Sequence, residues 1–157
     1  MSRLTHLDAA GRARMIDVSG KTPTERVATA VGQLTCQPET LAAVLAGTTP
    51  KGAVVQTAEL AGIMAAKRTA DLVPLCHPLP LSKAAVQITA DESLPGFWIS
   101  AEVKTVGVTG VELEALTAVS VACLTLFDML KAVDRTMVIG GIEVTGKSGG
   151  KSDNWQR

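Results

Sequence analysis

The feature that most constrains this chain is a run of thirteen uncharged residues, Ala115 to Phe127, inside a longer helical pattern from Gly110 to about Val133. Apolar side chains occur on all sides of this pattern, whereas a surface helix keeps one polar face. Such a helix must be buried centrally or at a subunit interface, and we expect Thr109 to cap it. Thirteen residues are too few for a membrane span of about twenty, so we expect no membrane partner.

Alternation of apolar and polar residues predicts strands at Glu25–Cys36, Lys83–Ala90, Phe97–Val106 and Met137–Val144. The second and third are joined by a D-E-S-L-P-G turn, which indicates a hairpin. In the last strand, Gly140 and Gly141 predict a bulge.

Two further helical patterns lie between these strands. A short helix begins at Pro38 and is closed by Gly47, and a longer one runs from Val54 to about Ala70 with small residues on its buried side. The order strand, helix, strand, strand, helix, strand is that of the split βαβ arrangement. We therefore predict an α+β, ferredoxin-like sandwich, with an antiparallel sheet and helices packed on one face.

With 157 residues, the chain suits one domain. Residues 1–14 are polar and aperiodic, so we expect a flexible N-terminal segment that orders only against a partner. Residues 15–157 would then form the single domain, and Met15–Val18 predicts a short additional strand.

Charge and composition exclude several partners. Lys plus Arg equals Asp plus Glu at 15 each, and aromatic residues make up 3% of the chain, so neither a basic surface nor stacking platforms for nucleic acid are expected. The hydrophobic share of 46% leaves apolar surface for contacts between copies of the chain.

The three cysteines, Cys36, Cys76 and Cys123, are odd in number and have no C-x-x-C spacing. This pattern argues against a disulfide framework or a structural zinc site. The N-terminus shows no basic stretch followed by an apolar one. We expect reduced thiols, a cytoplasmic protein and no bound metal.

The segment Lys67–Lys83, K-R-T-A-D-L-V-P-L-C-H-P-L-P-L-S-K, sets cations, a carboxylate and an imidazole among three prolines. A loop stiffened in this way can present side chains at fixed positions. A surface connector is the alternative. His77 is either structural or an acid/base group, and Lys67 and Arg68 suit a helix C-terminus even without a ligand.

The long helix carries charged residues only near its ends. Glu114 and Asp128 are fourteen residues apart, about 21 Å along the axis. Either the ligand is extended or the ends serve sites completed by different subunits, and the apolar middle favours the second. Glu112 points away from Glu114.

Asp128 and Lys131 lie on one helix face, where a surface ion pair is the default. Burial at the helix end would instead make them an acid/base pair.

The segment Gly141–Ser148 fits the written pattern G-x-x-x-x-G-K-[ST]. We reject a P-loop because the predicted strand lies within the motif and no helix can follow it. The amides of Gly149 and Gly150, with Lys147 and Lys151, could still form a nest for a phosphate.

Several blocks together resemble one family. They are T-H-L-D-A-A-G, M-I-D-V-S, P-K-G at Pro50–Gly52, C-H-P-L with its flanks, G-V-E-L-E-A-L-T-A-V-S, D-M-L-K and K-S-G-G-K. The combination is similar to the molybdenum-cofactor biosynthesis protein C family, the cyclic pyranopterin monophosphate synthases, from about Leu4 to Lys151. Between the two glutamates, Leu113 stands where the family often has methionine.

The resemblance implies a lyase that rebuilds the cyclised dihydro derivative of GTP and closes a cyclic phosphate with loss of diphosphate. Lys51, Asp128 and Lys131 would be the acid/base core. Substrate contacts would come from Leu75, Cys76, His77, Glu112, Leu113 and Glu114, and phosphate contacts from Arg26, Lys67, Arg68, Lys147 and Lys151.

The family also implies a homohexamer built as a trimer of dimers, with no cofactor required and Mg²⁺ accompanying the triphosphate at most. Two other readings remain open, a non-catalytic nucleotide- or phosphate-binding module and a purely structural oligomer.

Overall fold

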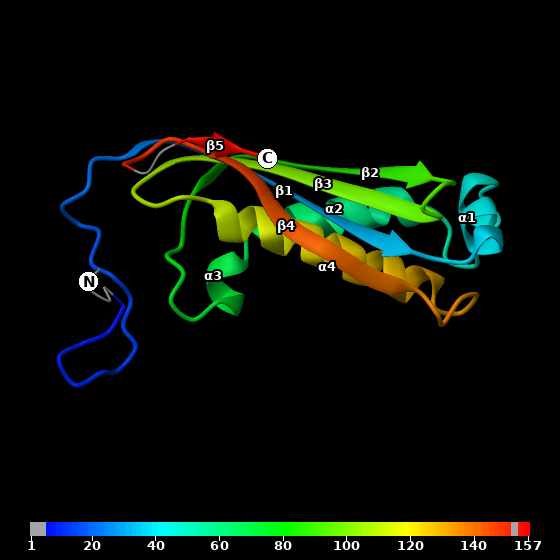
Figure 1. Cartoon of the computed structure of the whole chain (residues 1–157), viewed down its shortest axis with the longest axis horizontal. Coiled ribbons are helices and arrows are strands. Elements are labelled where there is room, and N and C mark those ends of the chain that lie inside the picture. Colours follow the sequence, from blue (N-terminus) through cyan, green and yellow to red (C-terminus); the bar gives the residue numbers. More distant parts are fainter. Residues whose placement is uncertain (1–5, 152–153) are drawn as a thin grey trace.

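The computed structural model describes residues 6–151 and 154–157 of the chain. Figure 1 shows a sheet with its helices gathered below it and at its ends. The elements are β1 (Thr24–Thr35), α1 (Pro38–Leu45), α2 (Val54–Ala66), α3 (Thr69–Leu72), β2 (Leu81–Asp91), β3 (Gly96–Gly107), α4 (Glu112–Leu130), β4 (Val138–Ser148) and β5 (Trp155–Gln156).

The strands form one antiparallel sheet in the order β2-β3-β1-β4-β5. Helices α2 and α4 run along one face of this sheet (Figure 1). The predicted α+β, ferredoxin-like arrangement is therefore confirmed, and so are the four longer strands. The two-residue strand β5, which pairs with β4, was not predicted because so short a segment carries no periodicity.

The core lies between the sheet and α4. Alternate residues of β1 and β3, such as Leu34 and Phe97, are fully buried, and so are Ala118 and Leu126 on α4. Burying one Leu or Phe side chain contributes roughly 1.5–3 kcal/mol. The small residues of α2 let it approach α4 closely, since a Cβ built on Gly62 would lie 2.7 Å from the carbonyl oxygen of Ala118.

The predicted bulge in β4 is present. Val31 pairs with Glu143 and Gln33 pairs with Gly140, so the register slips between them. Gly141 has a φ of +59°, in the left-handed region that glycine adopts without strain. The whole G-x-x-x-x-G-K-S pattern lies in β4, which confirms that it is not a P-loop.

Two predicted boundaries are wrong. Met15–Val18 forms no strand; instead the Asp17 side chain accepts a hydrogen bond from the Ser19 amide at 2.9 Å. The second helix ends at Ala66 rather than near Ala70, where the Arg68 amide donates to the Ala65 carbonyl at 2.9 Å in a tighter turn of the kind found at helix ends.

Helix α4 is shorter than predicted, from Glu112 to Leu130, and its N-cap is Val111 without a side-chain cap. Thr109 therefore does not cap it. Within the described residues, α4 is the one helix that is long and apolar enough to cross a membrane, judged by length and composition alone. The count of thirteen uncharged residues had predicted that no segment would pass this test. Half of its apolar window is buried in the fold, as in a core helix, which passes the same test.

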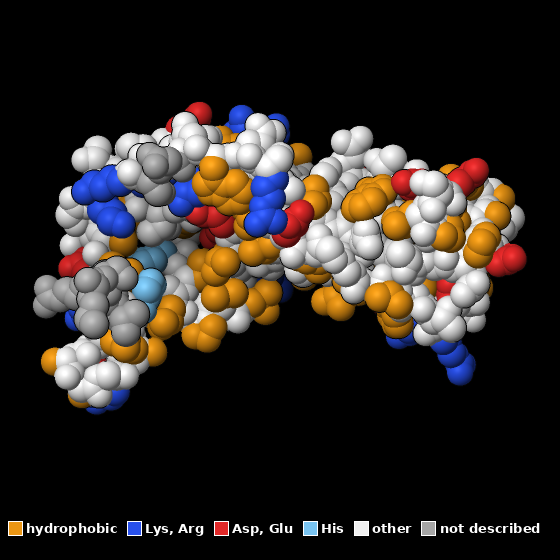
Figure 2. All heavy atoms as spheres, in the orientation of Figure 1, with side chains coloured by type: hydrophobic (Ala, Val, Ile, Leu, Met, Phe, Trp, Pro, Cys, Tyr) orange, Lys and Arg blue, Asp and Glu red, His pale blue; other side chains and the backbone are white. Residues whose placement is uncertain are grey.

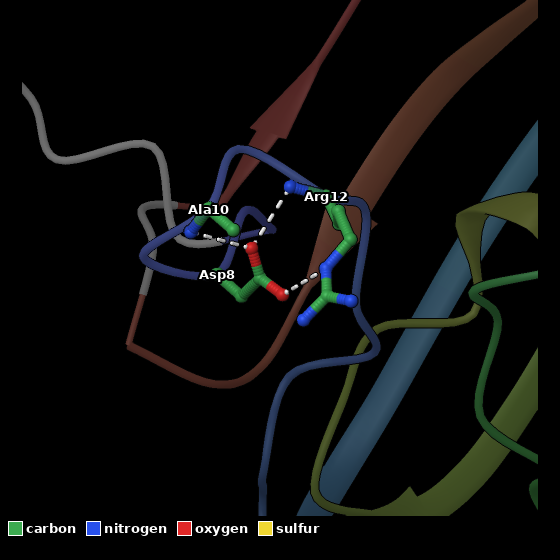
Figure 3. Close-up of polar contacts among 3 residues, drawn as sticks. All are labelled: Asp8, Ala10 and Arg12. Atoms are coloured by element: carbon green, nitrogen blue, oxygen red, sulfur yellow. Dashed lines mark hydrogen bonds and ion pairs between the residues drawn. The ribbon is translucent and has the colours of Figure 1, made fainter.

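A small hairpin precedes the domain. Leu7 forms a bridge with Ala13, and one oxygen of Asp8 accepts from the backbone amides of Ala10 and Arg12 at 2.8 and 2.9 Å (Figure 3). The other oxygen pairs with Nε of Arg12 at 2.9 Å. These bonds lower the pKa of Asp8, chiefly through the Arg12 amide. Residues 1–5 of the segment predicted to be flexible lie outside the described residues.

Candidate functional site

The two ends of α4 carry different chemistry. Glu112 and Asp128 are sixteen residues apart, which corresponds to about 24 Å along the helix. In Figure 1 the N-terminal end of α4 points toward the end of the molecule that carries the N-terminal segment and β5, and its C-terminal end lies toward α1. A single chain therefore presents two half-sites.

At the C-terminal end, Asp128 binds two lysines. Its carboxylate oxygens lie 2.7 Å from Nζ of Lys131 and 2.9 Å from Nζ of Lys51. Lys51 comes from the loop between α1 and α2, and its Nζ also donates to the Asp128 carbonyl at 3.1 Å. The predicted pair is therefore a cluster of three, with a cation at the negative end of the helix dipole.

The lysines hold Asp128 in its charged form. Hydrogen bonds from Lys131 first and Lys51 second lower the pKa of Asp128 to about 2. The side chains of Lys51 and Lys131 are 44% and 55% exposed. In the single chain the pair is therefore the exposed ion pair taken as the default, and not the buried pair considered as its alternative, because the helix end itself reaches the surface.

At the N-terminal end, Glu112 and Glu114 point apart, as predicted. Glu112 forms an ion pair with Nζ of Lys147 at 2.6 Å. Glu114 is buried, with 3% of its surface exposed, and one of its oxygens lies 3.7 Å from Sγ of Cys76. Its other oxygen makes no hydrogen bond within the part of the chain that the structure describes.

Burial raises the pKa of Glu114, and the neighbouring charge of Glu112 adds to this effect. Burial likewise raises the pKa of the Cys76 thiol to about 11. Cys76 is thus a neutral hydrogen-bond donor, and Glu114 is a carboxyl that retains its proton more readily than an exposed one.

The proline-rich loop after α3 brings Leu75, Cys76 and His77 to this end of α4, all partly buried. The ring of His77 is hydrogen-bonded through Nε2 to the carbonyl of Ile16, at 2.7 Å. Leu113 is 39% exposed on the surface of α4.

A cavity of about 560 Å³ lies beside these groups, and we call it the cation pocket. Four cations line it: Lys21, Arg26, Lys147 and Lys151. Figure 2 shows Lys and Arg side chains gathered at this end of the molecule. No carboxylate belongs to its described lining, so an anion is its natural ligand.

Arg26 comes from β1 and is only 9% exposed. Its Nε has no hydrogen-bond partner among residues 6–151 and 154–157. An unpaired buried guanidinium N–H is costly, which indicates a ligand. Gly150, with a φ of +87°, packs so closely against the Arg26 guanidinium that a Cβ added to this glycine would lie 2.0 Å from Nη1 of Arg26.

The structure does not bring all predicted phosphate contacts together. Lys67 and Arg68 are exposed after α2 and do not line the cation pocket. The predicted glycine nest is partly occupied, because the Gly149 amide donates to Oδ1 of Asn154 at 2.9 Å.

Sequence reasoning missed Lys21 and the threonines of the cation pocket, Thr22, Thr24 and Thr109. The G-K-T-P stretch at Gly20–Pro23 was the available signal. Within the described residues, no three His, Cys, Asp or Glu side chains are grouped as metal ligands would be.

Comparison with known proteins gives one consistent result. The MoaC family model matches residues 15–150. A cyclic pyranopterin monophosphate synthase of Brucella ovis is 60% identical over 153 residues, covering 98% of this chain and 93% of its own.

Proteins of the same name from Cereibacter sphaeroides and a Nostoc species are 59% and 58% identical. The alignments cover 99% and 98% of this chain, and 98% and 92% of theirs. With this identity over nearly its whole length, the chain belongs to the MoaC family.

Proposed function

We propose that the chain is a cyclic pyranopterin monophosphate synthase of molybdenum cofactor biosynthesis. It converts (8S)-3′,8-cyclo-7,8-dihydroguanosine 5′-triphosphate to cyclic pyranopterin monophosphate and diphosphate, as a lyase that forms a phosphorus–oxygen ring. The observation that carries this proposal is the cation pocket, in which the buried Arg26 has an Nε without a partner among the described residues and so calls for an anion. The relatives named above support the same activity.

The phosphate chain of the substrate occupies the cation pocket. Arg26, Lys147 and Lys151 neutralise its charge, and they retain the diphosphate as it leaves. Lys67 and Arg68 lie outside this pocket, so in this proposal they can contact the phosphates only in the site of a neighbouring subunit.

The ring system lies against Leu75, Cys76, His77, Glu112, Leu113 and Glu114. Glu114 can supply a proton to the ring during rearrangement, because burial favours its protonated form. The thiol of Cys76 orients the Glu114 carboxyl through their contact at 3.7 Å.

Lys51 and Lys131 act as the acid/base groups, with Asp128 holding both in place. Asp128 is ionised at neutral pH, so it orients the lysines and does not itself donate a proton. Since this cluster lies about 24 Å from Glu112 along α4, it completes the site of another subunit.

An exposed stripe along α4 supports this assembly. Leu113 and Leu124 are 39% and 60% exposed, and eleven residues at about 100° each place them within about 20° around the axis. Two copies that pair antiparallel along this stripe would bring the Asp128 cluster of one to the cation pocket of the other. We propose a homohexamer, arranged as a trimer of such dimers.

No cofactor is required in this proposal, and Mg²⁺ enters at most with the triphosphate. We propose a cytoplasmic enzyme that acts on a small molecule. Its balanced charge supplies no net field to attract nucleic acid or membranes, and we expect neither as a partner.

The direct test incubates the purified protein with the cyclised GTP precursor and quantifies diphosphate and the pterin product. Formation of both is expected. If the protein binds the precursor but forms neither product, and Lys131→Ala binds equally well, the chain is a non-catalytic phosphate-binding module. Absence of any thermal stabilisation by diphosphate would favour a structural oligomer.

A further inference from the structure

We propose that His77 fixes the segment 16–21 as a wall of the cation pocket, and that Lys21 at its end is a further binding residue for the phosphate chain. The identity of the ligand rests on the proposed function; the geometry does not. Lys21 is not among the residues to which the family resemblance gives a role. His77 was expected to be structural or an acid/base group.

The contact between His77 and Ile16 fixes the proton on the ring. A carbonyl oxygen can only accept, so Nε2 must carry a hydrogen and donate it across the 2.7 Å separation. Only Nδ1 then remains available to a substrate. The ring joins the loop after α3 to a segment sixty-one residues earlier in the chain.

Two local hydrogen bonds lie between Ile16 and Lys21. The carboxylate of Asp17 accepts from the Ser19 amide at 2.9 Å. Hydrogen bonding by the Ser19 side chain first and its amide second lowers the pKa of Asp17. The Lys21 amide donates to the Val18 carbonyl at 3.0 Å, which closes a turn. Between the Ile16 carbonyl and the pocket, the backbone amides of Ser19 and Lys21 are therefore both hydrogen-bonded within the segment.

Charge explains why the pocket needs this lysine. Glu112 partly neutralises Lys147 through their 2.6 Å contact, so Arg26 and Lys151 alone would face a ligand with several negative charges. Lys21 forms no ion pair within residues 6–151 and 154–157, and its charge is available in the pocket. Without the hold of His77, the exposed segment would move and take this charge with it.

The first test measures the affinity for inorganic diphosphate by titration calorimetry. Lys21→Ala should weaken binding by about 10-fold to 100-fold, the range of a charge-assisted hydrogen bond. The matched control is Lys104→Ala on β3, outside the pocket and 3.8 Å from Glu102, which should leave the affinity unchanged. Equal affinity in Lys21→Ala and the unmodified protein would overturn the assignment.

The second test separates positioning from direct contact. His77→Ala should weaken diphosphate binding and speed amide hydrogen exchange in residues 16–21, and His77→Gln, whose amide can still donate to Ile16, should restore most of both. Adding His77→Ala to Lys21→Ala should cost no further affinity, because His77 acts through Lys21. Additive losses in this double-mutant cycle would show that His77 binds the anion itself.

Failure of this inference differs from failure of the proposed function. If the unmodified protein turns over the precursor but Lys21→Ala keeps its diphosphate affinity, the inference is wrong and the function stands. If Lys21→Ala loses affinity but the unmodified protein forms no product, the site is right and the function is wrong.

Discussion

Asp128 is the residue on which the proposed acid/base cluster depends. Its carboxylate accepts from both lysines and its backbone carbonyl accepts from Lys51. Because its pKa is lowered to about 2, these contacts weaken only in strong acid, as pH falls through that value. Over the neutral range the lysines therefore keep a constant, negatively charged partner.

Replacing Lys131 by Ala should lower turnover of the cyclised precursor by about 100-fold to 10,000-fold, the usual contribution of a general acid or base. Precursor affinity and melting temperature should change little, because Lys131 is exposed. Steady-state kinetics and calorimetry measure the two effects, with Lys104→Ala as the control. Near-normal turnover would return Asp128 and Lys131 to a surface ion pair and pass the acid/base role to Lys51 and His77.

Lys147→Ala should weaken binding of both precursor and diphosphate by about 1.5–3 kcal/mol, as expected for loss of a charge-assisted hydrogen bond. Its partner Glu112 would also be left without a cation, and its negative charge would then oppose the ligand. Titration calorimetry with both ligands checks this. Unchanged affinities would remove Lys147 from the site.

Glu114 should carry a stability cost that grows with pH. Burial raises its pKa above the ordinary value of 4.5, so the folded state favours the proton that the unfolded state loses above that pH. Stability is thus lost as pH rises from about 4.5 through the folded pKa. Glu114→Gln, which stays neutral, should gain melting temperature relative to the unmodified protein between pH 4 and pH 8.

Thermal melts at several pH values test this, with Glu92→Gln on the exposed β2–β3 turn as control. A difference in melting temperature that is the same at every pH would mean that folding does not raise the pKa of Glu114.

At the scale of elements, the close approach of α2 to α4 sets the spacing of the helical layer. Gly62→Ala would gain roughly 1 kcal/mol of helix propensity. The new Cβ would, however, lie 2.7 Å from the Ala118 carbonyl oxygen and 3.3 Å from the Ala122 Cβ, and overpacking costs typically 1–3 kcal/mol. Because the 2.7 Å contact is to backbone, we expect net destabilisation.

Denaturant unfolding should show this loss for Gly62→Ala. Gly140→Ala in β4 is the control, because nothing lies within 4 Å of its added Cβ and its φ is not positive. Greater stability of Gly62→Ala would mean that α2 can shift away from α4 at little cost.

Periodicity predicted the elements well where one pattern extended over many residues, as in β1 and β3. It failed where local hydrogen bonds close a turn. The Arg68 amide donates to the Ala65 carbonyl where α2 ends, and the Lys21 amide donates to the Val18 carbonyl directly after the segment predicted as a strand. Neither contact leaves a periodic trace in the sequence.

The same distinction applies to the candidate site. Residue types marked Asp128, Lys131 and Glu114 as candidates, since charge in or beside an apolar helix is conspicuous. Their partners come from distant segments, as Lys51 does for Asp128 and Cys76 does for Glu114. Lys21 was missed because its role depends on a turn and a long-range anchor.

For the whole molecule, the proposed activity requires an assembly, since Asp128 and Glu112 lie about 24 Å apart along one helix. Exposed Leu60 and Met64 on α2 and Leu124 on α4 give apolar surface for it. We expect light scattering to report a mass several times the 16.3 kDa of the chain. A monomer mass at micromolar concentration would contradict this.

Shared sites also predict that two inactive variants restore activity when mixed. Lys131→Ala damages the acid/base half and Lys147→Ala damages the phosphate half. In a two-fold dimer with two interface sites, each mixed dimer would have one site built from intact halves and one with both defects. Unfolding and refolding an equal mixture should therefore recover about a quarter of the unmodified activity, since half the dimers are mixed and each keeps one of two sites. Each variant refolded alone is the control. If the mixture shows only the average of the two variants, every site is built within one chain, and a ligand would have to reach along the full length of α4.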